Sequence, residues 1–167
     1  MKPCYDWVAM LYFAYGSNLD WAQMKSRCKS AEYVCLAQLP NYRLAFPRRS
    51  SRGHGVAGVV AYRGASVWGV VYQLTKDDMR RLDAREGYYQ GELHRVNAYV
   101  RSRCQVLVNG EPDKRLTTWT YFAVAQSHEY APNAEYLNHI VSGAIHWKLP
   151  RDYIDRLAAI ETSEVEA

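Results

Sequence analysis

The sequence predicts an α+β fold, a small mixed β-barrel or curved sheet with flanking helices, in a single domain that spans residues 1–167. Three observations lead to this prediction. First, stretches typical of β-strands outnumber stretches with helical spacing. Second, strands and helices do not alternate regularly, as they would in a doubly wound parallel sheet. Third, a length of 167 residues is typical of one domain and suffices to bury a solid core, and no linker-like stretch divides the chain.

The chain is expected to begin with a strand, a turn and a short helix. Residues 8–14 form an apolar run typical of a buried strand. The following residues, Tyr15-Gly16-Ser17-Asn18, are typical of a turn. Residues 19–27 are predicted to form a short helix, with Ser17 or Asn18 as its N-cap.

The middle of the chain is expected to contain short strands and one helix. The strand-like stretches are residues 33–38, 42–46, 56–62 and 67–74. Pro40-Asn41 separates the first two, and residues 63–66 join the last two into a predicted hairpin. Thr75 and Asp78 resemble a capping box, with Asp in place of the usual Glu, and predict a helix that continues to about Arg85.

The last part is expected to contain three more strands and two helices. Gly87 and Gly91 bracket a tight connection. The strands are predicted at residues 96–99, 104–108 and 117–125. Residues 133–148 show helical spacing of apolar side chains, and Pro150 can open a second helix at its first turn.

Composition excludes several classes of protein. Hydrophobic residues make up 49% and charged residues 23% of the chain, which excludes a disordered chain. No apolar run approaches the roughly 20 residues that span a bilayer, and the N-terminus lacks the layout of a secretory signal. The four cysteines are scattered without a CxxC pair, so we expect reduced thiols in a cytoplasmic protein.

The charge of the chain is only mildly basic. A net charge of +4 is small, and a nucleic-acid-binding face needs a broader basic stripe. Arg48, Arg49, Arg52 and His54 cluster in a Gly/Ser-rich stretch that is typical of a loop. This cluster is either a solvated loop or a rim that attracts anions. We therefore expect no nucleic-acid partner and no membrane partner.

The first candidate site is the turn from Tyr15 to Asn18, between a buried strand and a helix. Gly16 allows a sharp turn, and the free N–H groups at a helix start can bind a carboxylate or a developing oxyanion. A strand–turn–helix with Gly and Asn is also a common structural cap, so this alternative stays open.

The second candidate is Glu86, which follows a predicted helix and precedes a glycine. A carboxylate at a helix C-terminus faces the negative end of the helix dipole, which is unfavourable by a few tenths to about 1 kcal/mol. Such a residue is either paired with Arg81 or Arg85, or kept for proton transfer.

Other familiar catalytic patterns are missing from the sequence. Ser17 does not lie in a nucleophile elbow, no cysteine has an obvious histidine partner, and there is no phosphate-binding loop. His139 and His146 share a helix face, but no carboxylate spacing completes a metal site, so a surface pair is expected. The sequence thus predicts no metal site.

Three motifs in order resemble the γ-glutamylcyclotransferase family. They are YFAYGSNL at residues 12–19, VWGVVY at residues 67–72 and LDAREG at residues 82–87. Further matching positions are Pro132, Tyr136, Gly143-Ala144, Leu149-Pro150, Tyr153 and residues 157–161. The similarity runs from about residue 11 to residue 161 and so covers nearly the whole chain.

This resemblance implies a compact mixed β-barrel with flanking helices, no metal and no organic cofactor. We expect a monomer or homodimer. The resemblance also implies cleavage of a small-molecule γ-glutamyl amide to 5-oxoproline and a free amine, with the substrate's own α-amine as nucleophile. The loop that holds the γ-glutamyl group would consist of Tyr15, Gly16, Ser17, Asn18 and Leu19. Glu86 would be the general acid/base.

Three further residues follow from the same resemblance. Tyr121 and Tyr136 occupy positions of pocket tyrosines in related proteins, although each could equally be a core-edge tyrosine. Leu93, seven residues after Glu86, stands where the family usually has Tyr. This departure predicts a less polar or bulkier amine portion, unless Leu93 points into the core. A non-catalytic binding or interaction module on the same fold remains an alternative, because fold does not determine function.

Overall fold

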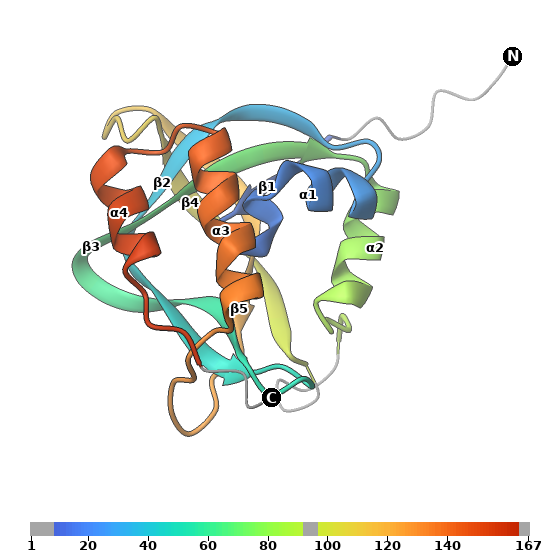
Figure 1. Cartoon of the computed structure of the whole chain (residues 1–167). Helices are drawn as coiled ribbons and strands as arrows, with labels where there is room; N and C mark the ends of the chain where they lie inside the picture. The colour runs from blue at the N-terminus through green and yellow to red at the C-terminus, as the bar shows by residue number, and fades with distance from the viewer. Residues whose placement is uncertain (1–8, 92–96, 164–167) are drawn as a thin grey trace, which may run out of the picture.

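The computed structural model describes residues 9–91 and 97–163, and in them five strands form a closed barrel with helices around it (Figure 1). The strands are β1 (Met10–Ala14), β2 (Glu32–Arg49), β3 (Gly55–Leu74), β4 (Tyr99–Val108) and β5 (Arg115–Ala123). Around the barrel the order is β1-β3-β2-β4-β5. Neighbouring strands are antiparallel, except that β1 and β5 close the barrel in parallel through the pair Tyr12 and Trp119. The predicted mixed barrel is therefore confirmed.

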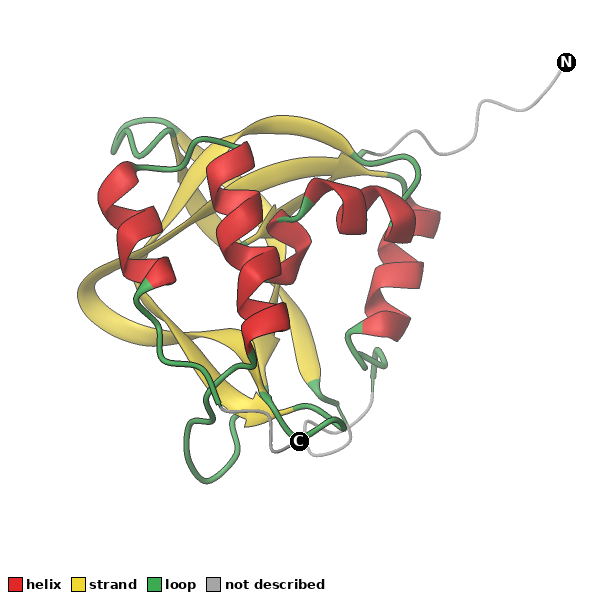
Figure 2. Cartoon of the chain, viewed as in Figure 1, coloured by secondary structure: helices red, strands yellow, loops and turns green. Residues whose placement is uncertain are grey.

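A 3₁₀ turn and four helices cover the barrel (Figure 2). They are η1 (Ser17–Leu19), α1 (Trp21–Arg27), α2 (Lys76–Arg85), α3 (Ala134–His146) and α4 (Arg151–Ala158). The helix α3 lies directly against η1, and Gly143 permits this contact. A Cβ atom at Gly143 would lie 2.3 Å from the Leu19 carbonyl carbon. None of the described helices has the length and apolar character that crossing a bilayer requires.

The two longest strands correct the predictions for residues 33–74. The expected pair of short strands around Pro40-Asn41 is one strand, β2, and the expected hairpin around residues 63–66 is the middle of one strand, β3. The register shifts near Asn41, whose side-chain oxygen accepts a hydrogen bond from the Gly64 amide at 3.2 Å. Asn41 and Gly64 both have positive φ. These turn-forming residues therefore produce a bulge that bends both strands together, not two chain reversals.

One of the two predicted helix caps is confirmed and the other is wrong. The Thr75 side chain accepts a hydrogen bond from the Asp78 amide, as predicted, and Asn133 caps α3. The N-cap of α1 is Asp20, not Ser17 or Asn18, because Ser17–Leu19 form a separate 3₁₀ turn. The side chain of Asn18 is therefore free to face the inside of the molecule.

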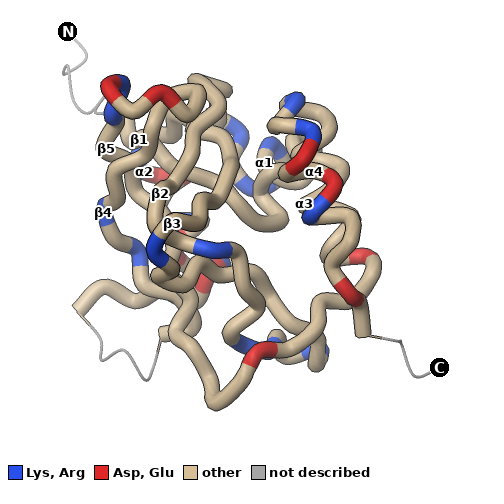
Figure 3. The backbone as a smooth tube through the Cα atoms, turned by 90° about the vertical axis from the view of Figure 1, so that its left-hand side faces the viewer, with Lys and Arg blue, Asp and Glu red and all other residues tan. Residues whose placement is uncertain are grey.

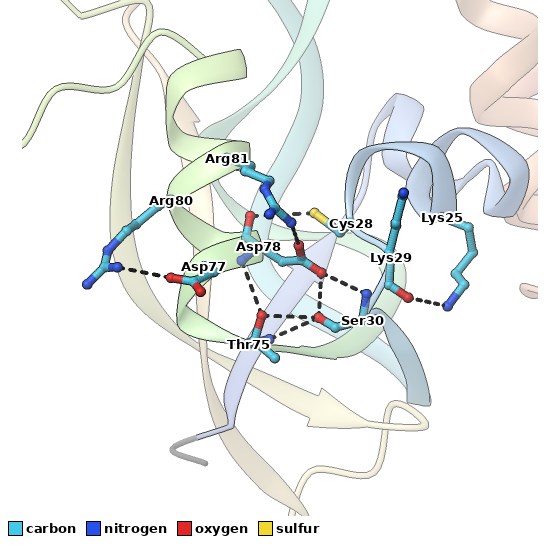
Figure 4. Close-up of polar contacts among 9 residues, drawn as sticks. All are labelled: Lys25, Cys28, Lys29, Ser30, Thr75, Asp77, Asp78, Arg80 and Arg81. Atoms are coloured by element: carbon cyan, nitrogen blue, oxygen red, sulfur yellow. Dashed lines mark hydrogen bonds and ion pairs between the residues drawn. The ribbon is translucent and has the colours of Figure 1, made fainter. Parts of the chain in front are cut away.

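A buried carboxylate joins the segment after α1 to the first turn of α2 (Figure 4). Asp78 accepts hydrogen bonds from the amide and hydroxyl of Ser30, and from Arg81 at 2.6 Å. Burial alone would raise the pKa of Asp78, but these hydrogen bonds and the Arg81 charge hold the pKa below the usual aspartate value. This cluster therefore fixes the position of α2.

We predict that Asp78→Asn destabilises the protein by about 1.5–3 kcal/mol, because it removes charge-assisted hydrogen bonds to a buried carboxylate. The measurement is urea-induced unfolding at neutral pH. Because the folded-state pKa is depressed, this contribution is present above the unfolded-state pKa of about 3.9 and is lost as the pH falls through the folded-state value.

Asp77→Asn is the matched control, since Asp77 pairs with Arg80 on the surface with 76% and 74% of the two side chains exposed. Exposed pairs contribute roughly 0–1 kcal/mol. Equal stability of the two variants would show that the Asp78 cluster does not anchor α2.

Candidate active site

Two adjoining cavities bring the candidate residues together. The inner cavity is lined mainly by five tyrosines, the turn Gly16-Ser17-Asn18 and Glu86; the tyrosines are Tyr12, Tyr15, Tyr99, Tyr121 and Tyr136. The outer cleft has a volume of about 400 Å³ and contains four arginines. Ser17, Glu86, Tyr99 and Tyr136 line both. Glu86 therefore lies at the boundary between an aromatic cavity and a basic cleft.

The turn after β1 approaches β3 closely. Gly16 has a φ of −108°, so it does not use the left-handed region. Its requirement is space, because a Cβ atom would lie 3.2 Å from the Ala57 Cβ and 3.8 Å from the Tyr136 hydroxyl. Leu19, the last residue of the predicted loop, is fully buried and lines neither cavity. Its backbone oxygen accepts a hydrogen bond from the Trp147 indole at 3.0 Å, which holds the end of the turn.

Asn18 is the central polar residue of the inner cavity, with 4% of its surface exposed. Its side-chain oxygen accepts a hydrogen bond from Arg27 at 2.7 Å. Its amide nitrogen therefore faces the other way, and donates to the Tyr12 hydroxyl at 3.0 Å and more weakly to Glu86 Oε1 at 3.4 Å. The Tyr72 hydroxyl holds the Asn18 backbone oxygen at 2.9 Å.

Glu86 is the C-cap of α2, and Gly87 follows it with a φ of +65°. Burial raises the pKa of Glu86, although the charges of Arg27 and Arg85 and the hydrogen bond from Asn18 act in the opposite direction. Within the described residues Glu86 makes no ion pair with Arg81 or Arg85, and Arg81 binds Asp78 instead. The alternative that Glu86 is paired with Arg81 or Arg85 is therefore not supported by the described residues.

Tyr121 and Tyr136, both predicted from the sequence, line the inner cavity. The Tyr121 hydroxyl donates to Asp83 at 2.6 Å, and its backbone oxygen accepts from the Tyr15 hydroxyl. The Tyr136 hydroxyl accepts a hydrogen bond from the Ala57 amide at 3.0 Å, and burial raises its pKa to about 12. Both hydroxyls are therefore protonated at neutral pH.

Sequence reasoning missed three residues that the fold brings to the site. They are Tyr12, Tyr99 and Arg27. Tyr12 lies within the YFAYGSNL motif, so its place in that motif could have indicated it. The other two come from separate elements, and no local pattern in the sequence connects them with Asn18 or Glu86. Leu93, the last predicted site residue, lies outside the described residues.

Only part of the predicted basic cluster lies at the site. Arg48 and Arg49 line the outer cleft, whereas Arg52 and His54 do not. Elsewhere on the tube in Figure 3, Lys and Arg positions are interspersed with Asp and Glu positions.

His139 pairs with Asp20 at 2.7 Å. In residues 9–91 and 97–163 no group of three His, Cys, Asp or Glu residues could hold a metal ion.

Comparison with known proteins gives consistent results. The family model of the AIG2-like family matches residues 66–157. The γ-glutamylcyclotransferase of Mus musculus is 34% identical over 160 residues, which cover 92% of this chain and 80% of the mouse protein. The γ-glutamylcyclotransferase of Homo sapiens is 33% identical over 165 residues, which cover 95% and 82% of the two chains.

A solved structure named γ-glutamyl cyclotransferase has the same fold. It superimposes with a TM-score of 0.84 at 29% identity and covers 95% of this chain and 92% of its own. On sequence and fold together, the chain belongs to the AIG2-like γ-glutamylcyclotransferase family.

Proposed function

We propose that this protein is a γ-glutamylcyclotransferase that cleaves a γ-glutamyl amide to 5-oxoproline and a free amine, in one domain whose core spans about residues 11–161. The observation that carries the proposal is the position of Glu86, a partly buried carboxylate with a raised pKa between two adjoining cavities. Enzymes of this kind act on a small molecule, and the outer cleft of about 400 Å³ beside the aromatic cavity has the size of a small-molecule site.

The reaction needs no nucleophile from the protein. The substrate's α-amine attacks its own γ-carbonyl carbon, a new C–N bond closes the five-membered ring, and the original amide C–N bond breaks. Well-oriented intramolecular reactions reach effective molarities of about 10⁵–10⁸ M, so holding the glutamyl chain folded is a large part of catalysis. The described lining of both cavities contains no cysteine and no histidine, which agrees with this division of work.

Glu86 would move the proton. In its ionised form the carboxylate accepts a proton from the α-ammonium group, and the protonated acid then donates to the leaving nitrogen. Such transfer typically contributes about 10²–10⁴-fold to the rate. A raised pKa makes the Glu86 carboxylate a stronger base than an ordinary surface glutamate. It also favours the protonated form of Glu86 that later donates to the leaving nitrogen.

The residues around the inner cavity would bind one end of the γ-glutamyl group, because the cavity itself has a volume of only about 30 Å³. The backbone N–H groups of Ser17 and Asn18 begin the 3₁₀ turn, where such groups lack partners within the turn. They would stabilise either the α-carboxylate or the oxyanion of the tetrahedral intermediate. The tyrosine rings enclose the apolar part of the chain, and the protonated hydroxyl of Tyr136 can turn towards a substrate oxygen.

This mechanism requires no metal and no organic cofactor, because every step is a proton transfer or an acyl transfer within the substrate. We place the protein in the cytoplasm, on the ground that Cys28, Cys35 and Cys104 are all free thiols. No observation among the described residues favours the alternative of a non-catalytic binding module. The partly buried Glu86 and the Asn18 amide directed at it favour catalysis instead.

We predict that Glu86→Gln folds normally and loses at least about 100-fold in kcat, because Gln keeps the size and hydrogen bonding of the side chain but cannot accept a proton. The measurement is 5-oxoproline release from γ-glutamyl-alanine, together with the melting temperature of the variant.

The control is Glu111→Gln, which removes a glutamate that pairs with Lys114 and lines neither cavity. A Glu86→Gln variant that kept more than a tenth of the wild-type kcat would remove Glu86 from the role of acid/base.

The pH dependence gives a separate prediction. Because the pKa of Glu86 is raised, the acid limb of the kcat/KM profile should lie above the usual glutamate value of about 4.3. The Arg27 charge lowers this pKa, so Arg27→Gln should move the acid limb to higher pH. Arg27→Lys keeps the charge and should move the limb less. An acid limb that stays in place in Arg27→Gln would contradict the assignment of that limb to Glu86.

A further inference from the structure

The outer cleft combines four arginines with a single carboxylate. Arg27, Arg48, Arg49 and Arg85 line it, and Glu86 is the only acidic residue in its described lining. None of these four arginines forms an ion pair with a carboxylate of residues 9–91 and 97–163. Six of the ten other arginines in the described residues do form an ion pair with an Asp or Glu, so the cleft concentrates positive charge that the fold leaves unneutralised.

Three separate elements supply this charge. Arg27 ends α1, Arg85 ends α2, and Arg48 and Arg49 end β2. Arg48 donates to the backbone oxygens of Ala98 and Val124, at 3.3 and 2.8 Å, which fixes its guanidinium group in the cleft wall. The Arg49 guanidinium lies 5.5 Å from the centre of the Tyr130 ring. Arg27 donates to the Asn18 side chain, so three of the four guanidinium groups are held in place before any ligand arrives.

The position of Glu86 determines what can occupy this cleft. In the proposed reaction Glu86 must reach both the α-amine of the glutamyl group and the leaving nitrogen. The inner cavity, with a volume of about 30 Å³, admits only part of the glutamyl group, so the scissile nitrogen lies near Glu86 and the rest of the amine portion extends into the outer cleft. Its chemical partner there is the row of arginines.

We propose that the outer arginines select γ-glutamyl amides whose amine portion carries negative charge, and that they favour two acidic groups, as in a dicarboxylic amino acid, over one. This inference rests on the proposed cyclotransferase function and specifies its substrate. Guanidinium groups bind carboxylates through paired, charge-assisted hydrogen bonds, which fits an acidic amine portion and not a neutral one. It differs from the prediction of a less polar or bulkier amine portion based on Leu93, and the substrate series below tests both.

The test compares three substrates of similar size: γ-glutamyl-glutamate, γ-glutamyl-glutamine and γ-glutamyl-butylamine, whose amine portions carry two, one and no negative charges. For the wild-type protein, kcat/KM should fall at each step of this series. The ratio between the first and last substrates should fall by about tenfold or more in Arg49→Gln/Arg85→Gln, given the usual strength of hydrogen bonds to charged groups. The ratio is informative because a change in the Glu86 pKa affects all three substrates alike.

Two controls accompany the series. Arg52→Gln removes a nearby arginine that does not line the cleft, and should leave the ratio unchanged. Added salt should reduce the preference of the wild-type protein for the most acidic substrate, because the Debye length shortens from about 10 Å at 0.1 M to about 3 Å at 1 M.

The outcomes separate this inference from the proposed function. Equal kcat/KM for the three substrates in the wild-type protein would overturn the inference and leave the cyclotransferase function standing. An equal loss for all three substrates in the double variant would also overturn it, because the arginines would then bind the glutamyl α-carboxylate. No 5-oxoproline from any substrate would overturn the proposed function, and the inference with it.

Discussion

The hydrogen bond from Arg27 to the side-chain oxygen of Asn18 orients the centre of the site. The oxygen and the nitrogen of a side-chain amide point in different directions. Because the Asn18 oxygen faces Arg27, the Asn18 amide nitrogen faces Tyr12 and Glu86 and donates hydrogen bonds to them. Arg27 also acts on Glu86 through its charge, which partly offsets the effect of burial on the Glu86 pKa. The Arg27 guanidinium group thus affects both the hydrogen bonding and the pKa of Glu86. It can do so only when the turn η1 and the helices α1 and α2 are in their folded positions.

The barrel and its helices supply that placement. The Asp78 cluster fixes the beginning of α2, and the contact between Asp83 and Tyr121 fixes its last turns against β5. Arg101 approaches the same Asp83 carboxylate at 3.3 Å from β4. Glu86 follows directly, at the end of a helix held at both ends, so its carboxylate has little freedom to leave the boundary between the two cavities. The side chain that would transfer the proton is therefore attached to a helix whose position is fixed.

Local patterns predicted what depends on local chemistry. The Thr75 cap, the position of Glu86 after its helix and the turn at Gly16 follow from neighbouring residues, and the structure contains all three. The two long strands were not predictable in the same way, because Asn41 and Gly64 suit a bulge as well as a turn and only the pairing of β2 with β3 decides between them. Arg27 and Tyr99 reach the site through contacts between distant segments. The resemblance to a family indicated the loop and Glu86, but it said nothing about the unneutralised charge of the outer cleft.

The parallel pairing of β1 with β5 has a consequence for how the molecule is made. The barrel closes only when Tyr12 pairs with Trp119. The first strand synthesised, β1, therefore cannot complete its pairing until the last strand, β5, has been synthesised. Contacts between such distant parts of a chain form late and slow the folding rate. The hydrogen bond from Tyr15 to the backbone of Tyr121 belongs to the same seam. The inner cavity is therefore incomplete in any nascent chain that lacks β5, which carries Tyr121, or α3, which carries Tyr136.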